Sequence, residues 1–178
     1  MRTLVIGGAR SGKTGVAEWL LHDEPDVTYV ATGYLPASDD AEWQARVARH
    51  QGLRPETWTT METTDVAGLL RATGGPLLVD CLTLWLTRVM DEERCWDDEE
   101  WLFGGESRLR EVSADLMSAL EGTTRDVVLV TNEIGQGVVP ASTSGRRFRD
   151  EMGLLNASVA RACDDVLLCV AGRTLRLS

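Results

Sequence analysis

Residues 7–14 read Gly-Gly-Ala-Arg-Ser-Gly-Lys-Thr, which matches the pattern G-x-x-x-x-G-K-[ST] of a phosphate-binding loop. Glycines let the main chain adopt positive φ and bring its N–H groups against phosphate oxygens. In this pattern Lys13 reaches the β- and γ-phosphates, and the hydroxyl of Thr14 ligates Mg²⁺. The sequence therefore predicts a nucleoside triphosphate site that uses Mg²⁺. The predicted phosphate-binding residues are Gly7, Gly8, Ala9, Arg10, Ser11, Gly12, Lys13 and Thr14.

A strand and a helix must flank this loop to position it. The apolar, β-type run Thr3–Ile6 precedes it, and a helix-forming stretch from Lys13 to His22 follows it. The N-terminus of that helix adds positive dipole where the phosphates would lie. The alternative is a glycine-rich turn that matches the pattern by chance. The strand before the loop, the helix after it and the position of the loop near residue 8 all argue against that alternative.

A carboxylate at the end of a second strand would complete a Mg²⁺ site. The run Leu77–Val79 has the character of a buried strand, and Asp80 follows it directly. This favours a role for Asp80 at the metal or nucleotide, and a simple cap of the following helix is the alternative. Glu133 closes another strand, and the loop Gly135–Pro140 after it is either a rim of the site or an ordinary turn. Because ligands of open α/β sheets bind beyond the carboxyl ends of the strands, we expect both acids in one crevice.

His50 is one of only two histidines, and the other, His22, is expected to cap the end of the first helix. Arg46 and Arg49 precede His50 on the same predicted helix. A neutral imidazole beside guanidinium groups can attack an α-phosphate and form a phosphoramidate while the arginines hold the departing pyrophosphate. His50 also shares a helical face with Trp43, so a packed, structural histidine is the alternative at this point.

The order of elements predicts the fold class. At 178 residues, with 43% hydrophobic and 26% charged residues, the chain 1–178 is expected to form a single globular domain. Short β-branched runs alternate with longer helical stretches, which predicts an α/β fold with a mostly parallel sheet flanked by helices. The expected strands are Thr3–Ile6, Val27–Ala31, Leu77–Asp80, Val127–Thr131, Val166–Val170 and Thr174–Leu177, and the expected helices are 13–22, 40–50, 63–72, 97–121 and 144–163.

Composition limits the partners. The net charge of −10 disfavours nucleic acid or an anionic membrane as the main partner. No apolar run approaches about 18 residues, so no membrane insertion is expected, and the chain enters a strand too early for a signal peptide. The four cysteines form no C-x-x-C pair, and we interpret them as free thiols in a reducing cytoplasm, with Cys81 and Cys169 as packing residues. Asp91–Glu100 holds seven carboxylates in ten residues and is expected to be a solvated helix start or surface loop.

Further motifs make the chain resemble the bifunctional adenosylcobinamide kinase / adenosylcobinamide-phosphate guanylyltransferase family of cobalamin biosynthesis. The resemblance covers nearly the whole chain. The family is RecA-like in fold and oligomeric, so the resemblance implies a RecA-like P-loop NTPase domain and a homo-oligomer, with the subunit number open and a trimer among the options. The motifs that carry it beyond the phosphate loop are Tyr29–Thr32, the spaced residues from Arg46 to Glu62, Leu78–Thr83, Val130–Pro140, Arg147–Asp150 and Asn156.

The resemblance implies two reactions at one GTP site. The γ-phosphoryl group first passes to the aminopropanol hydroxyl of adenosylcobinamide, with GTP or ATP as donor. A second GTP then guanylylates His50, and the GMP moves to the new phosphate to give adenosyl-GDP-cobinamide. No N-K-x-D element is present, so the guanine preference rests on the resemblance alone. Beyond the loop, the implied nucleotide-binding residues are Ala31, Thr32, Gly33, Gln51, Gly52, Leu53, Arg54, Glu62 and Asp80, with Thr14 and Asp80 at the metal.

Two other functions remain as alternatives. The first is a monofunctional P-loop small-molecule kinase in which His50 is structural. The second is a nucleotide-dependent switch or binding protein without group transfer. The second is disfavoured because the sequence shows no switch-type recognition elements and no adaptor region beyond the core.

Overall fold

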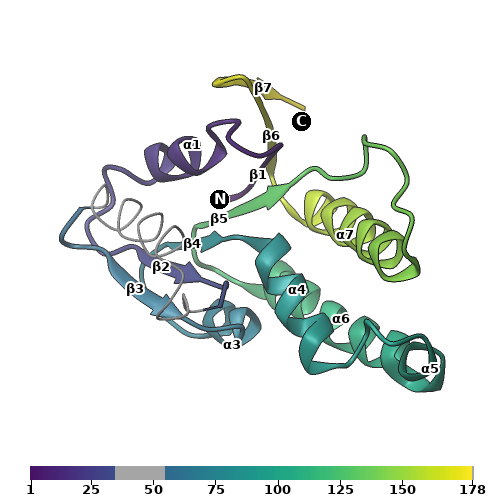
Figure 1. Cartoon of the computed structure of the whole chain (residues 1–178). Helices are drawn as coiled ribbons and strands as arrows, with labels where there is room; N and C mark the ends of the chain where they lie inside the picture. Colours follow the sequence, from purple (N-terminus) through teal and green to yellow (C-terminus); the bar gives the residue numbers. More distant parts are fainter. Residues whose placement is uncertain (35–54, 178) are drawn as a thin grey trace, which may run out of the picture.

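The structure, a computed structural model, describes residues 1–34 and 55–177. In that part of the chain, seven strands form one sheet in the order β3-β2-β4-β5-β1-β6-β7 (Figure 1). Neighbouring strands are parallel, except for the antiparallel pair β6 and β7. The mostly parallel α/β sheet is therefore confirmed. The strands are β1 (Arg2–Gly7), β2 (Thr28–Ala31), β3 (Thr59–Glu62), β4 (Leu77–Asp80), β5 (Val127–Asn132), β6 (Asp165–Val170) and β7 (Arg173–Arg176).

Helices cover both faces of the sheet (Figure 1). Helix α1 packs on one face, and α3, α4, α6 and α7 pack on the other. No helix of the described residues is both long enough and apolar enough to cross a membrane. The helical elements are α1 (Lys13–Leu20), α3 (Val66–Arg71), α4 (Leu82–Glu92), α5 (Asp98–Glu100), the π-helical turn η1 (Trp101–Gly105), α6 (Glu106–Gly122) and α7 (Thr143–Ala162).

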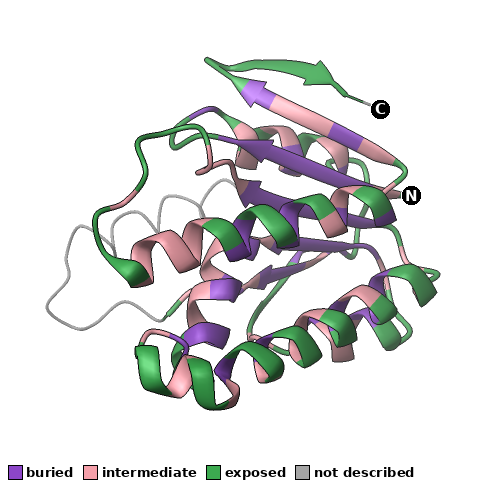
Figure 2. Ribbon diagram, turned by 90° about the vertical axis from the view of Figure 1, so that its right-hand side faces the viewer, coloured by how far each residue is buried: buried purple, intermediate pink, exposed green. Residues whose placement is uncertain are grey.

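The central strands are buried on both faces, as Figure 2 shows. In β4, Leu77 and Val79 face α3, α4 and α6, whereas Leu78 faces α1, and all three are fully buried. Strands covered by helices on both sides carry continuous apolar runs, which explains why the sequence predicted them well. The edge strand β7 is exposed along its whole length.

Two elements are absent from the sequence-based prediction. Strand β3 lies at the edge of the sheet and is exposed throughout, so its residues Thr59–Glu62 lack the apolar character by which the other strands were identified. Helix α4 follows β4 almost at once, and it buries one face that includes Trp85 and Val89. The predicted helix 40–50 lies outside the described residues.

The prediction of one helix over 97–121 is wrong. A short helix, α5, is followed by the turn η1 and then by α6. Phe103 and Gly104 have non-helical backbone angles, and Gly104 has a φ of 124°. Because a glycine adopts positive φ without steric cost, Gly104 interrupts the helix where the charge pattern alone suggested continuity.

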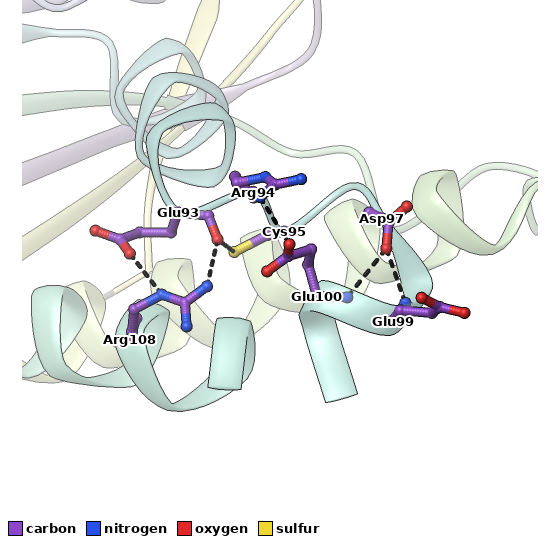
Figure 3. Close-up of polar contacts among 7 residues, drawn as sticks. All are labelled: Glu93, Arg94, Cys95, Asp97, Glu99, Glu100 and Arg108. Atoms are coloured by element: carbon purple, nitrogen blue, oxygen red, sulfur yellow. Dashed lines mark hydrogen bonds and ion pairs between the residues drawn. The ribbon is translucent and has the colours of Figure 1, made fainter. Parts of the chain in front are cut away.

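The acidic segment Asp91–Glu100 is a largely exposed turn and helix start, as predicted, and local contacts organise its charges (Figure 3). The Asp97 carboxylate accepts hydrogen bonds from the N–H groups of Glu99 and Glu100, at 2.9 and 3.0 Å, and so caps α5. Glu93 pairs with Arg108 of α6 at 2.9 Å, and Arg94 pairs with Glu100 at 2.7 Å. The segment thus ties the end of α4 to α6.

Candidate nucleotide-binding site

In the described part of the chain, the carboxyl ends of six parallel strands lie along one edge of the sheet. In the strand register Gly7 pairs with Asn132, and Ala31 pairs with both Glu62 and Asp80. The structure therefore brings predicted site residues from β1, β2, β3 and β4 to the edge where open α/β sheets bind ligands. The order of strands separates these residues along that edge.

Strand β5 lies between β4 and β1, and this sets the distance from each acid to the phosphate-binding loop. At the usual strand spacing, Asp80 is about 10 Å from the end of β1 and Glu62 is about 19 Å from it. Glu62 is therefore too far away to contact a phosphate held in the loop. Asp80 is near enough to act there through a metal ion or a water molecule.

The loop after β1 has the backbone that a phosphate cradle requires. Arg10 and Gly12 both have left-handed conformations, with φ of 57° and 93°. Gly12 directly precedes α1, whose first N–H groups are not used within the helix. Lys13 Nζ donates to the carbonyl oxygen of Gly8 at 3.0 Å and so spans the loop. Alternating handedness of this kind directs main-chain N–H groups into one concave surface that binds anions.

The C-terminal hairpin supports the loop from behind. Gly172 N–H donates to the Ser11 carbonyl at 3.0 Å, from the turn between β6 and β7. At Gly7 there is no room for a side chain, because a Cβ atom would lie 2.5 Å from the Cys169 carbonyl oxygen. The hairpin itself was predicted, and positive φ at Ala171 and Gly172 makes its tight turn possible. Its contact with the loop joins residues about 160 positions apart and could not be predicted.

Asp80 is held at the end of β4 by the neighbouring strand. Its carboxylate accepts a short hydrogen bond from the Tyr29 hydroxyl of β2. The Thr32 N–H donates to the Asp80 carbonyl at 3.3 Å, and the Thr32 hydroxyl donates to the Cys81 carbonyl at 2.7 Å. Burial, and then the charge of Asp80, raise the pKa of the Cys81 thiol. Cys81 is therefore a protonated packing residue, as predicted.

A polar network that the sequence analysis missed lies between the loop strand and Asp80. The Thr131 hydroxyl donates to Asn156 Oδ1 at 2.7 Å, and Asn156 Nδ2 donates to the Asn132 carbonyl at 3.1 Å. The Thr83 hydroxyl accepts from both the N–H and the Nδ2 of Asn132, at 3.0 and 3.1 Å. The network joins β5 to α4 and α7. The family motifs contain its residues, and a pair of polar residues ends the apolar strand β5, but neither signal shows that these side chains meet.

The segment after β2 is held by α4. Arg88 Nη1 donates to the carbonyl oxygens of Thr32 and Gly33, at 3.5 and 3.4 Å. Its guanidinium also lies over the Tyr34 ring, 5.2 Å from the centroid, and the Tyr34 hydroxyl donates to Asp91. This fixes the predicted residues Ala31–Gly33 beside the edge of the sheet.

His50, the predicted nucleophile, lies outside the described residues, as do Gln51, Gly52, Leu53 and Arg54. Their assigned roles stay predictions. The other histidine is where the sequence placed it, because His22 Nδ1 lies 2.7 Å from the Trp19 carbonyl at the end of α1.

Glu133 remains beside the loop, held there by its backbone, whereas its carboxylate makes a local contact. Its N–H donates to the Gly7 carbonyl at 3.2 Å, and its Oε1 accepts from the Gly135 N–H at 2.5 Å. The residues from Gln136 to Val139 that follow are exposed, whereas Gly135 and Pro140 are partly buried. The segment is thus a surface loop at the rim of the sheet edge.

A parallel sheet with a glycine-rich loop between its strand β1 and the helix α1 defines a P-loop NTPase fold. Two type III secretion ATPases share it, one described as prototypical and the other being EscN from enteropathogenic E. coli, with TM-scores of 0.55 and 0.52 at 12% and 13% identity. Their alignments cover 94% and 96% of this chain but only 50% and 43% of those longer chains, and at this identity they show the fold alone.

The particular family is defined by sequence. The family described as cobinamide kinase / cobinamide phosphate guanyltransferase matches residues 3–177, and the chain belongs to it. A relative from Pseudomonas aeruginosa, the bifunctional adenosylcobalamin biosynthesis protein CobP, is 40% identical over 99% of this chain and 97% of its own length. The proteins named CobU from Escherichia coli and Salmonella typhimurium are 38% and 37% identical, and both alignments cover 97% of each chain.

Proposed function

We propose that this chain phosphorylates the aminopropanol hydroxyl of adenosylcobinamide and then transfers GMP from GTP to that phosphate, through a guanylyl group on His50. The product is adenosyl-GDP-cobinamide. The observation that carries the proposal is a phosphate-binding loop of the required backbone at the same sheet edge as Asp80, in a chain of this family.

In the first step, main-chain N–H groups from Gly8 to Thr14 hold the phosphates, and α1 directs its positive end at them. Lys13 exchanges its bond to the Gly8 carbonyl for the phosphate oxygens. The substrate hydroxyl oxygen attacks the γ-phosphorus, the bond to the β–γ bridging oxygen breaks, the nucleoside diphosphate leaves, and the hydroxyl proton is released to water. Positioning and neutralisation of charge by the loop and Lys13 supply most of the acceleration in such a transfer.

The residues at the loop fit a magnesium ion. Thr14 is the second residue of α1, and its hydroxyl is a hard oxygen ligand. Asp80 ends β4, which lies two strand spacings, or about 10 Å, from β1, and from there its carboxylate could reach the metal through water. When bound there, Mg²⁺ would neutralise charge on the phosphate oxygens. Thr14 and Asp80 are thus the two residues of this chain that we propose to hold it.

In the second step the imidazole of His50 attacks the α-phosphorus of another GTP, and pyrophosphate leaves. A phosphate oxygen of adenosylcobinamide phosphate then attacks the same phosphorus and releases His50. Two displacements through a nitrogen nucleophile are each easier than one direct transfer. Gln51–Arg54 and Ala31–Gly33 would line the nucleotide, and the distant Glu62 would contact its nucleoside end.

We propose in addition that the chain forms a homo-oligomer in the cytoplasm, where GTP is available. Large apolar side chains that are exposed next to one another, as Leu102 and Phe103 are, support an oligomer, because contiguous exposed apolar surface marks sites of contact between proteins. Trp19, Leu102 and Phe103 are 66%, 81% and 84% exposed. Size-exclusion chromatography with light scattering tests this, and a monomer at micromolar concentration would contradict it.

Labelled GTP separates the proposal from its alternative. The protein is incubated with α-labelled or γ-labelled GTP, with and without adenosylcobinamide, and the experiment is repeated with His50→Ala. We expect an acid-labile, alkali-stable α-label on the wild type that is absent from His50→Ala, while γ-label still reaches the corrinoid in both. If γ-label reaches the corrinoid but no wild-type protein carries α-label, the chain is a monofunctional kinase.

A further inference from the structure

We propose that Arg149 binds a phosphate oxygen at this sheet edge through its guanidinium Nη1. The phosphate is either the γ-phosphate of the nucleotide or the phosphate of the corrinoid substrate, and the chemistry of recognition is the same for both. The inference rests on the proposed function and gives a role to an arginine of α7, a helix to which the two proposed reaction steps assign no residue.

The course of α7 places Arg149 beyond the ends of the strands. The chain leaves β5 at the carboxyl edge and returns to β6 at the opposite edge, so α7 begins near the site and runs away from it. Asn156 marks the level of the last residues of β5, to which it is hydrogen-bonded. Arg149 precedes Asn156 by two helical turns, about 10 Å, on the same side of the helix. It therefore extends past the edge on which the phosphate loop lies.

A short chain of contacts connects Arg149 with the start of the loop. Arg149 Nη2 donates to the Gly135 carbonyl, and the Gly135 N–H donates to Glu133 Oε1 at 2.5 Å. The Glu133 N–H then donates to the carbonyl of Gly7, the last residue of β1. The guanidinium is thus held next to the site by one backbone contact.

The other terminal nitrogen of Arg149 has no partner among residues 1–34 and 55–177. Nη1 is shielded from water and forms no hydrogen bond with any described residue. None of the ion pairs among the described residues includes Arg149. A shielded donor on a cation is costly when it is unpaired, and a phosphate oxygen relieves that cost with a charge-assisted bond.

The neighbouring arginines on α7 do not share this property. Arg146 donates to the carbonyls of Pro140 and Ala141 and to the Thr143 hydroxyl, all at the start of its own helix. Arg147 pairs with Asp98 of α5 at 2.6 Å and lies over a tryptophan ring. Both are used in structural contacts. Of the three, Arg149 is the one whose terminal nitrogen is shielded from water and unpaired among the described residues.

Binding of matched ligands tests the assignment in Arg149→Gln, with Arg146→Gln as the control. Titration calorimetry gives the affinity for GTP and GDP, and separately for adenosylcobinamide phosphate and adenosylcobinamide. A bond to the γ-phosphate predicts that Arg149→Gln weakens GTP at least about tenfold and leaves GDP unchanged. A bond to the corrinoid phosphate predicts the same selective loss for adenosylcobinamide phosphate over adenosylcobinamide. Arg146→Gln should change neither ratio.

Two results overturn the inference. In the first, Arg149→Gln leaves unchanged both the ratio of GTP to GDP affinity and the ratio of adenosylcobinamide phosphate to adenosylcobinamide affinity. In the second, Arg149→Gln weakens all four ligands equally and Arg146→Gln does the same, which would mean that Arg149 only holds the loop at Gly135 in place. If Arg149→Gln does not fold, Arg149→Lys retains one charged donor for the Gly135 carbonyl, and the same ratios are read from it. These ratios are measured by binding alone, so they test the role of Arg149 even if the wild type transfers no GMP. Failure of the proposed function would be recognised separately, as the absence of GMP transfer by the wild type.

Discussion

Replacing Asn156 with alanine would test whether the polar network beside the site is a structural part of it. Asn156 is 7% exposed and makes two hydrogen bonds to the last residues of β5. The substitution leaves the fully buried Thr131 hydroxyl without its acceptor and the Asn132 carbonyl without the amide donor of Asn156.

The magnitude follows from those two bonds. Each one contributes about 1–1.5 kcal/mol when its partner is left buried and unsatisfied, so the free energy of unfolding should fall by about 2–3 kcal/mol. For a chain of this length, each kcal/mol lowers the midpoint of thermal unfolding by about 2–4 °C. We therefore expect a midpoint about 4–12 °C below that of the wild type.

Urea and thermal unfolding, monitored by circular dichroism, measure the effect. Leu154→Ala is the matched control, because Leu154 lies on α7 but is 52% exposed, and it should change the unfolding free energy by less than about 0.5 kcal/mol. If Asn156→Ala is as stable as the control, the network does not hold β5, and the reasoning that placed it in the site is refuted.

Three further predictions concern the loop, the division of labour and the thiols. Lys13→Ala should lower the rates of both reaction steps by about 100-fold or more. His50→Ala should abolish GMP transfer and leave the rate of the kinase step unchanged. An equal loss of both steps in His50→Ala, measured with labelled GTP, would contradict this division. Gly7→Ala would drive a Cβ to within 2.5 Å of the Cys169 carbonyl, so we expect weaker GTP binding by calorimetry and about 1–3 kcal/mol less stability; a variant with wild-type affinity and stability would refute the close packing. Burial raises the pKa of the Cys163 thiol to about 12, from 9.0. The unfolded thiol therefore loses its proton first, and the stability that this difference contributes is lost as the pH rises from about 9 towards 12. Urea unfolding at about pH 8 and pH 10.5 should show a larger loss in the wild type than in Cys163→Ala, and an equal loss would show that the thiol is not shielded.

The buried part of the fold could be predicted because its signal is local. The apolar runs of β4 and β5 are continuous, and helices cover both faces, so these strands were found within a residue or two. The exposed edge strand β3 has no such run and was missed. The break at Gly104 was missed for a different reason, because a glycine inside a charged helical stretch indicates a break only once its φ is known.

The site likewise consists of residues that the sequence predicted and of long-range contacts that it could not predict. The phosphate loop is contiguous in the sequence, so its residues could be named from the motif, and the conformations of Arg10 and Gly12 agree with it. Asp80 was found because it ends a buried strand. The contacts that hold these parts, such as that between Tyr29 and Asp80, join residues far apart in the chain and depend on strand order, which the motif does not encode.

The central claim is that a single imidazole of this chain carries GMP between two substrates. Mass spectrometry of the intact protein after incubation with GTP and Mg²⁺, followed by peptide mapping under alkaline conditions, tests it most directly. We predict a mass increase of one guanylyl group per chain, located on His50 and removed when adenosylcobinamide phosphate is added. A protein that stays unmodified, or that carries the group on another residue, would contradict the account.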